Sequence, residues 1–116
     1  MDEILEQALL YDFYGELLTE HQKEIYEQFV QEDLSLSEIA EDAGISRQGV
    51  HDLVKRCHRL LEGYESRLHL VERFLSIKKK VHAIDDLLDS YEKNPKDPEA
   101  MIEGIRSISD TIIEEL

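Results

Sequence analysis

Both prolines of this chain lie in one short stretch, at Pro95 and Pro98, and no other feature constrains the fold as much. Proline interrupts the interior of a helix, so the long stretch before residue 95 is free of the strongest helix breaker. The glycines occur singly, and no two alternating apolar runs are joined by a hairpin turn. The sequence therefore predicts an all-α fold. Residues 93–98 are the expected loop, and Asp97 before Pro98 marks the start of the last helix.

Helix-capping signals place the ends of the first helices. The pairs Thr19–Gln22 and Ser35–Glu38 have the spacing of capping boxes, in which two side chains satisfy free backbone N–H groups at a helix start. Gly44 can adopt the left-handed conformation that ends a helix, and Ser46 can cap the next one. Gly63 is the expected bend or break in that helix. We expect helices over about residues 2–17, 20–31, 36–43 and 47–61.

Apolar spacing predicts which faces of these helices are buried. In the first helix the predicted buried stripe is Leu5, Leu9 or Leu10, Phe13 and Leu17, and in the second it is Ile25, Phe29 and Val30. An aromatic group is expected to form core between these helices, with a docking surface for a protein partner as the alternative: Tyr11, Phe13, Tyr14, Tyr26 and Phe29.

Residues 35–59 carry the most informative pattern, that of a helix-turn-helix. Ala40 is a small side chain where two crossing helices need a close approach, and Gly44 falls at the turn between them. The positions expected to face the shared core are Ile39, Ala43, Ile45, Val50 and Leu53. This arrangement fixes the outward side of the second helix.

The outward side is rich in side chains that recognise nucleic acids. Arg and Gln near the start of a recognition helix suit base edges, whereas Lys and Arg further along suit phosphates. The predicted nucleic-acid-binding residues are Ser46, Arg47, Gln48, His51, Lys55, Arg56 and Arg59. The alternative is that the helix-turn-helix only packs three helices and that these charges keep its surface solvated.

The charge of the whole chain opposes binding to phosphate, but this segment differs from the rest. The chain has 27 acidic and 13 basic residues, for a net charge of −14. Residues 1–35 carry ten acids and one lysine, whereas residues 45–59 carry four basic groups and one acid. We therefore expect any binding to be modest and sensitive to salt.

The second half of the chain predicts a helical hairpin arm. A long helix is expected over about residues 64–91, followed by a last helix with Met101, Ile105, Ile108, Ile112 and Ile113 on one side. Residues spaced 3-4-3-4-3 along the long helix form a seam like that of a coiled coil, and we predict a homo-oligomer, such as a homodimer, through it: Phe74, Ile77, Val81, Ile84, Leu88 and Tyr91. The predicted domains are a helix-turn-helix head at residues 1–63 and the arm at 64–116, within one continuous folded unit. The basic cluster Lys78-Lys79-Lys80 with His82 is expected on a solvated face opposite the seam, with added phosphate contacts as the alternative.

Three segments together resemble the YlxM family of small bacterial helix-turn-helix proteins: residues 11–19 (YDFYGELLT), 34–41 (LSLSEIAE) and 44–50 (GISRQGV). The middle of the chain is also similar to the fourth region of sigma factors. The resemblance implies a sigma-region-4-like helix-turn-helix, with Arg47, Gln48, His51 and Lys55 as reading positions and Gly49 and Val50 as structural ones. It also implies a regulatory part in the signal recognition particle pathway, with that particle's RNA, its GTPase or DNA as partner.

Two further functions stay open beside a nucleic-acid-binding regulator. One is a protein-interaction module in which the acidic first helices and the arm dock a basic partner such as the particle's GTPase. The other is a transcriptional regulator that reads a DNA sequence.

Other functional classes find little support in the sequence. The single Cys57 excludes an internal disulfide framework, and paired Cys/His zinc ligands are absent, so neither a metal nor another cofactor is expected. No phosphate-binding glycine loop or nucleophile motif occurs, and we expect no catalytic residues. The acidic start Met1-Asp2-Glu3 and the lack of a long apolar run favour a cytoplasmic protein without membrane segments.

Overall fold

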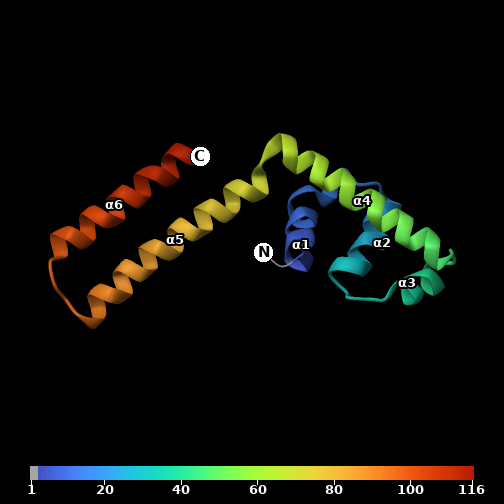
Figure 1. Ribbon diagram of the computed structural model, residues 1–116, viewed down its shortest axis with the longest axis horizontal. Helices are drawn as coiled ribbons and strands as arrows, with labels where there is room; N and C mark the ends of the chain where they lie inside the picture. The colour runs from blue at the N-terminus through green and yellow to red at the C-terminus, as the bar shows by residue number, and fades with distance from the viewer. Residues whose placement is uncertain (1–2) are drawn as a thin grey trace. The chain divides into compact units, whose positions relative to one another are not determined.

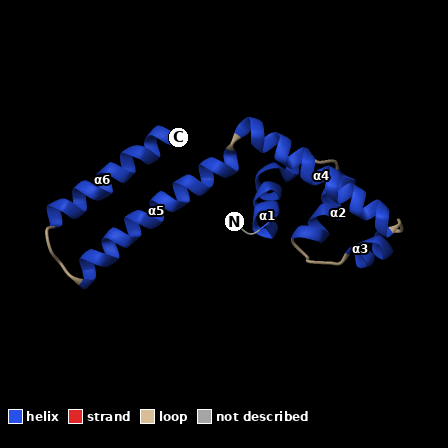
Figure 2. Cartoon of the chain, viewed as in Figure 1, coloured by secondary structure: helices blue, strands red, loops and turns tan. Residues whose placement is uncertain are grey.

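The computed structural model describes residues 3–116, so Met1 and Asp2, where the first helix was expected to begin, lie outside the described residues. The described residues form only helices and connecting loops (Figure 2), which confirms the all-α prediction. The elements are α1 (Glu3–Tyr14), the 3-10 turn η1 (Gly15–Leu17), α2 (Glu20–Val30), α3 (Leu36–Ala43), α4 (Arg47–Leu68), α5 (Leu70–Lys93) and α6 (Pro98–Glu115). The chain divides into two compact units, one that ends at Val71 and one over Glu72–Leu116. The division into a head at 1–63 and an arm at 64–116 stays a prediction.

In the first unit, α1, α2 and α3 all pack against α4 (Figure 1). The side chains of α4 that face them recur at helical spacing and are Val50, Val54, Cys57 and Leu61. They meet Leu10, Tyr14, Leu18, Ile25, Tyr26, Ile39 and Ala40 from the other helices, all of them buried. Burial of this set from water is the main source of stability of the unit.

The predicted caps are confirmed. Thr19 Oγ1 accepts from the Gln22 N–H at 3.2 Å while Gln22 returns the bond to Thr19, and Ser35 and Glu38 form the same pair. Gly44 ends α3 in the left-handed conformation with φ of 70°. Ser46 Oγ accepts from the Gly49 N–H at 2.9 Å and so caps α4. The helix-turn-helix geometry therefore follows from local signals.

The predicted buried face of the first helix is confirmed at Leu10 and is wrong at Leu5, Phe13 and Leu17. Leu5, Phe13 and Leu17 are exposed, whereas Leu10, Tyr14 and Leu18 are buried. The chain leaves the α-helix at Gly15, where the Tyr11 ring packs so closely that an added Cβ would lie 2.9 Å from it. The tighter 3-10 turn that follows brings Leu18 to the inside in place of Leu17.

Part of the predicted helix-turn-helix core is also wrong. Ile39, Ala40 and Val50 are buried as expected, but Ala43 and Ile45 are exposed and Leu53 is only half-buried. Ala43 is the last residue of α3 and Ile45 lies in the turn after it, so neither is enclosed as Ile39 and Ala40 are. Among the aromatic residues, Tyr14 and Tyr26 are buried, Tyr11 and Phe29 are half-buried and Phe13 is exposed.

Helix α4 continues through Gly63 to Leu68, beyond the expected end near Leu61. It ends at His69, which has a φ of 56°. Two side chains of the preceding helices then bond the start of α5. Tyr14 Oη donates to Glu65 Oε1 and accepts from the Leu70 N–H at 3.1 Å. The Val71 N–H donates to the same Glu65 oxygen at 2.9 Å. These contacts supply the partners that the first N–H groups of a helix need.

In the second unit, α5 and α6 lie side by side and run in opposite directions, which confirms the predicted hairpin (Figure 1). Asp97 caps α6 by accepting from the Ala100 N–H at 3.1 Å. Lys80 pairs with Glu115 of α6, and Ser76 Oγ donates to the same carboxylate at 2.8 Å. Lys80 is therefore not on a solvated face, as had been expected, because its ammonium group holds the two helices together.

Candidate nucleic-acid interface

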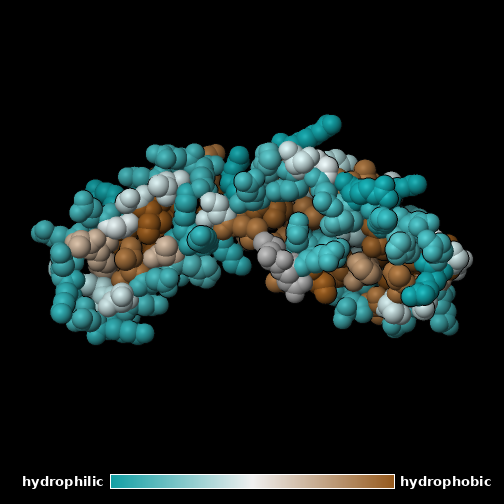
Figure 3. All heavy atoms as spheres, in the orientation of Figure 1, coloured by the Kyte–Doolittle hydropathy of each residue, from teal (hydrophilic) through white to brown (hydrophobic). Residues whose placement is uncertain are grey.

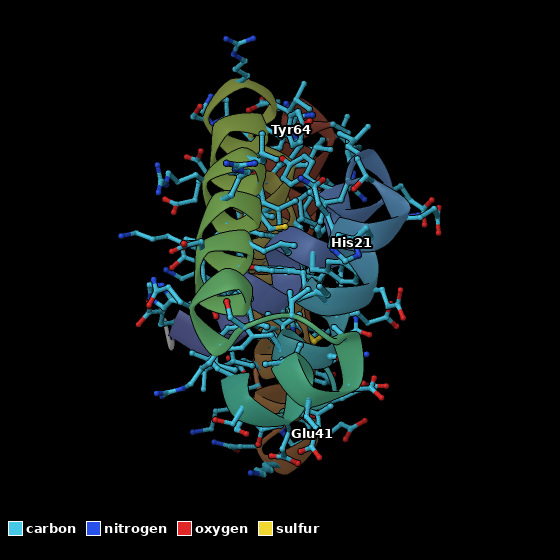
Figure 4. All side chains as sticks on the ribbon, turned by 90° about the vertical axis from the view of Figure 1, so that its right-hand side faces the viewer. His21, Glu41 and Tyr64 are labelled. Carbon is cyan, nitrogen blue, oxygen red and sulfur yellow. The ribbon has the colours of Figure 1, made fainter. Side chains whose placement is uncertain are left out.

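The outward face of α4 carries the residues predicted to bind nucleic acid. Since Val50, Val54, Cys57 and Leu61 turn inward, the side chains between them turn to solvent. All seven predicted residues are exposed: Ser46, Arg47, Gln48, His51, Lys55, Arg56 and Arg59. Figure 4 shows nitrogen-tipped side chains projecting from the side of α4 that faces away from the other helices of this unit.

These residues form two neighbouring rows along the helix, because side chains four apart lie above one another. One row is Arg47, His51, Lys55 and Arg59, and the other is Gln48, Asp52 and Arg56. The structure brings Arg47, Gln48 and His51 together around one open hollow, with Leu36 of α3. It brings Lys55, Arg56 and Arg59 around a second hollow, with Asp52 and Leu60.

Asp52 is an acidic side chain on this face that was not predicted to take part. Gln48 Nε2 donates to Asp52 Oδ1 at 3.0 Å, and His51 Nδ1 lies 3.5 Å from the same oxygen. Asp52 therefore holds the Gln48 amide in one orientation and places a negative charge among the basic groups. A spacing of four between Gln48 and Asp52 was the signal that could have revealed this pair.

Helix α2 contributes a further polar residue that the sequence did not reveal. A third hollow lies between the start of α2 and α4, with His21 and Gln22 on one side and Asp52 and Arg56 on the other. Figure 4 labels His21 on α2 at this side of the unit. No local pattern connects His21 with α4, because the contact depends on how the two helices pack.

Reactive groups under this face are buried and held in their neutral forms. Burial raises the pKa of the Cys57 thiol to about 11, with a small opposing effect of Arg56. Burial also raises the pKa of Tyr26, whose ring is fully enclosed. A protonated, enclosed thiol is neither a nucleophile nor a metal ligand, so Cys57 acts as a small apolar residue of the core.

The comparisons with known proteins agree with this geometry. The family UPF0122, described as "Putative helix-turn-helix protein, YlxM / p13 like", matches residues 1–104. The chain belongs to this family. The resemblance to YlxM proteins drawn from residues 11–50 is thereby confirmed, and the matched region includes the whole helix-turn-helix.

Relatives in the UPF0122 family cover most of the chain. A UPF0122 protein of Clostridium kluyveri is 46% identical over 90 residues, which are 78% of this chain and 81% of the relative. One of Thermoanaerobacter pseudethanolicus is 44% identical over 100 residues, 86% of each chain. One of Acetivibrio thermocellus is 50% identical over 80 residues, 69% of this chain and 68% of the relative. The names of these relatives give only the family, and the helix-turn-helix description comes from the family itself.

The helices in the described part of the chain include none with the length and apolar content needed to cross a bilayer.

Proposed function

We propose that this chain is a nucleic-acid-binding regulatory protein that uses the outward face of α4. The observation that carries the proposal is the exposure of four basic side chains, Arg47, Lys55, Arg56 and Arg59, on one face of the second helix of a helix-turn-helix. Ser46 and the first turn of α4 lie at the same end as Arg47 and Gln48, where free N–H groups favour a phosphate. Arg47 and Gln48 would contact bases, and the basic groups further along would contact the backbone.

The resemblance to YlxM proteins guides the choice of nucleic acid. It suggests the RNA of the signal recognition particle as the first partner to test. Duplex DNA is the alternative, and a sequence preference in it would indicate a transcriptional regulator.

A second function, docking of a basic protein, is favoured by a different observation. Leu5 and Leu17 are 58% and 57% exposed in the most acidic part of the chain. Exposed leucines in an acidic segment suit a partner with basic and apolar side chains, such as the particle's GTPase.

One binding experiment distinguishes the two functions. Fluorescence anisotropy would measure the affinity of the full chain for labelled signal recognition particle RNA and for random duplex DNA, at about 50 mM and about 200 mM salt. The test variant combines Arg47→Ala with Lys55→Ala. The control combines Lys93→Ala with Lys96→Ala, which removes the same charge from exposed positions in the second unit.

We expect the test variant to bind at least about ten-fold more weakly at the lower salt, and the control to bind nearly as the natural chain does. Loss of the Lys55 phosphate contact should also reduce the slope of log affinity against log salt by about 0.9 for duplex DNA, or about 0.7 for a single strand. Equal binding by both variants would exclude this face as the site. Absence of binding to either nucleic acid would instead favour the docking function, which a pull-down with the GTPase at low and high salt then tests.

A further inference from the structure

Helix α5 carries apolar side chains on more of its surface than α6 covers. The side toward α6 is defined by Lys80 and Ser76, which bond Glu115, and by Leu87, which lies 3.1 Å from where a Cβ on Gly104 would be. A second stripe, about a third of a turn away at 3.6 residues per turn, consists of Phe74, Val81 and Leu88, which are 39%, 46% and 41% exposed. These residues recur every seven positions, so they stay in line along the helix.

A neighbouring line of residues, Ile77, Ile84 and Tyr91, is half-buried at the edge of the α5–α6 contact. The two lines together are the predicted seam, which is half-buried along one edge, while Val81 and Leu88 on its other edge are exposed. No residue of Glu72–Leu116 is buried. Figure 3 shows apolar atoms gathered over α5 and α6 between hydrophilic borders. A two-helix hairpin with exposed apolar side chains and no buried residue can bury further apolar surface against a partner.

The charges on α5 are arranged with opposite signs at its two ends. Residues 70–81 carry four basic side chains and one acid, whereas residues 82–93 carry four acids and one lysine. Lys80 is engaged with Glu115. Lys78 is exposed and its ammonium group lies 5.9 Å from the centre of the Phe74 ring, and Lys79, Asp85 and Asp86 are also exposed. A helix with this distribution is complementary to a second copy of itself only when the two run in opposite directions.

We propose that the open side of the seam binds the same side of a second copy of this chain, with the two α5 helices antiparallel around a two-fold axis near residues 82 and 83. In one register, Val81 meets Ile84 of the second copy, Ile77 meets its Leu88, and Phe74 meets its Tyr91. All six seam residues are paired in this register and none is left over. The result is a four-helix bundle made from two α5–α6 hairpins.

The flanking charges fit this register and not the parallel one. On the side of the seam away from α6, Lys78 lies nearest to Asp85 of the second copy, and the symmetry repeats this pair. A parallel pair would place the basic half of α5 against the basic half of its partner. The complementary ends therefore select the antiparallel dimer.

Sedimentation equilibrium of the full chain tests the dimer and its direction. We expect a mass of twice 13.5 kDa at micromolar concentrations. Val81→Asp with Leu88→Asp should give the monomer mass, because the seam would have to bury two carboxylates. Circular dichroism of this variant checks that its helices persist.

Charge reversals keep the proposal testable even if that variant unfolds. Lys78→Glu alone and Asp85→Lys alone should each weaken the dimer about ten-fold, because each turns two attractive contacts into repulsive ones. An equimolar mixture of these two chains should form a heterodimer tighter than either homodimer. Lys79→Glu and Asp86→Lys are the matched controls, since they lie on the opposite side of α5 from the seam and should leave the mass unchanged.

A mass of 13.5 kDa at about 100 µM overturns the proposal and leaves the stripe to a different protein. The proposal is also overturned if the Val81→Asp, Leu88→Asp variant is folded and still has the mass of a dimer. A dimer that Lys78→Glu and Asp85→Lys leave unchanged overturns the antiparallel register.

Discussion

The turn of the helix-turn-helix depends on one left-handed residue, and its replacement has a calculable effect. Gly44 has a φ of 70°, and a Cβ added there would meet no atom within 4 Å. In Gly44→Ala the only penalty is therefore the backbone conformation, about 1–2 kcal/mol for a residue with a side chain. The stiffer unfolded chain of the variant offsets about 0.5 kcal/mol of this. We expect Gly44→Ala to destabilise the first unit by about 1 kcal/mol.

Gly63→Ala is a matched change with the opposite expected sign. Gly63 lies inside α4, and a Cβ there also meets nothing within 4 Å. Alanine is favoured over glycine in a helix interior by about 1 kcal/mol, so this variant should be more stable than the natural chain. Both glycines belong to the first unit, and the two variants therefore report on the same unfolding transition.

Thermal unfolding followed by near-ultraviolet circular dichroism measures both effects through the buried rings of Tyr14 and Tyr26. For a unit of this size, 1 kcal/mol corresponds to a change in Tm of about 4–8 °C. We expect a decrease of that size for Gly44→Ala and an increase for Gly63→Ala. An unchanged or higher Tm in Gly44→Ala would refute the dependence of the turn on a left-handed residue. A lower Tm in Gly63→Ala would show that α4 does not continue through this position.

Three further predictions follow from the side-chain contacts. Burial raises the pKa of Cys57 to about 11, so iodoacetamide at pH 8 should modify it only after unfolding, which mass spectrometry of the native and denatured chain can detect. The hydrogen bond from Lys80, with a second from Ser76, lowers the pKa of Glu115 below its ordinary value near 4.5. The contribution of the Glu115 carboxylate to hairpin stability is therefore complete above about pH 4.5 and is lost as the pH falls through the lower pKa of the folded state. Glu115→Gln should abolish this part of the acid transition seen by circular dichroism. Asp52→Asn should bind nucleic acid about two- to five-fold more tightly at low salt, because it removes an exposed repulsion of about 0.5–1 kcal/mol, and an unchanged affinity in anisotropy would contradict that role.

Features that depend on a few neighbouring residues could be predicted from the sequence. The caps at Thr19, Ser35 and Ser46 each join groups three residues apart, and at the turn the Gly44 N–H donates to the Ala40 carbonyl four residues before it. Such hydrogen bonds form wherever the chain is helical and do not need a particular tertiary arrangement. The helix-turn-helix can therefore be predicted from the sequence without the tertiary packing of its helices.

Features that depend on packing between helices could not be predicted in the same way. Leu9 and Leu10 are consecutive, so the spacing alone does not decide which of them faces inward, and the packing of α1 in the structure buries Leu10. The end of α4 at Leu68 likewise depends on Tyr14, which is 51 residues from its partner Glu65 in sequence. Lys80 was expected in solvent because its partner Glu115 lies on another helix.

The exposure of the candidate residues on α4 could be predicted from the sequence, but their side-chain contacts could not. Since α4 is one uninterrupted helix from Arg47 to Leu68, its spacing alone places Arg47, His51 and Lys55 in one row. The contribution of His21 and the restraint by Asp52 depend on side-chain orientation and on the packing of α2. Spacing along α4 carries no information on either.

The net charge of −14 and a nucleic-acid-binding face are compatible because screening limits the range of the acidic groups. Charges are screened over about 8 Å at physiological salt, but over about 30 Å at 0.01 M. The row from Arg47 to Arg59 extends about 18 Å along α4, at a rise of 1.5 Å per residue. At physiological salt a phosphate beside this row is therefore influenced mainly by the four basic groups and Asp52. At very low salt the same phosphate is also repelled by the acids of residues 1–35. The attraction of the basic face for phosphate is therefore opposed less by these acids at physiological ionic strength than at very low salt.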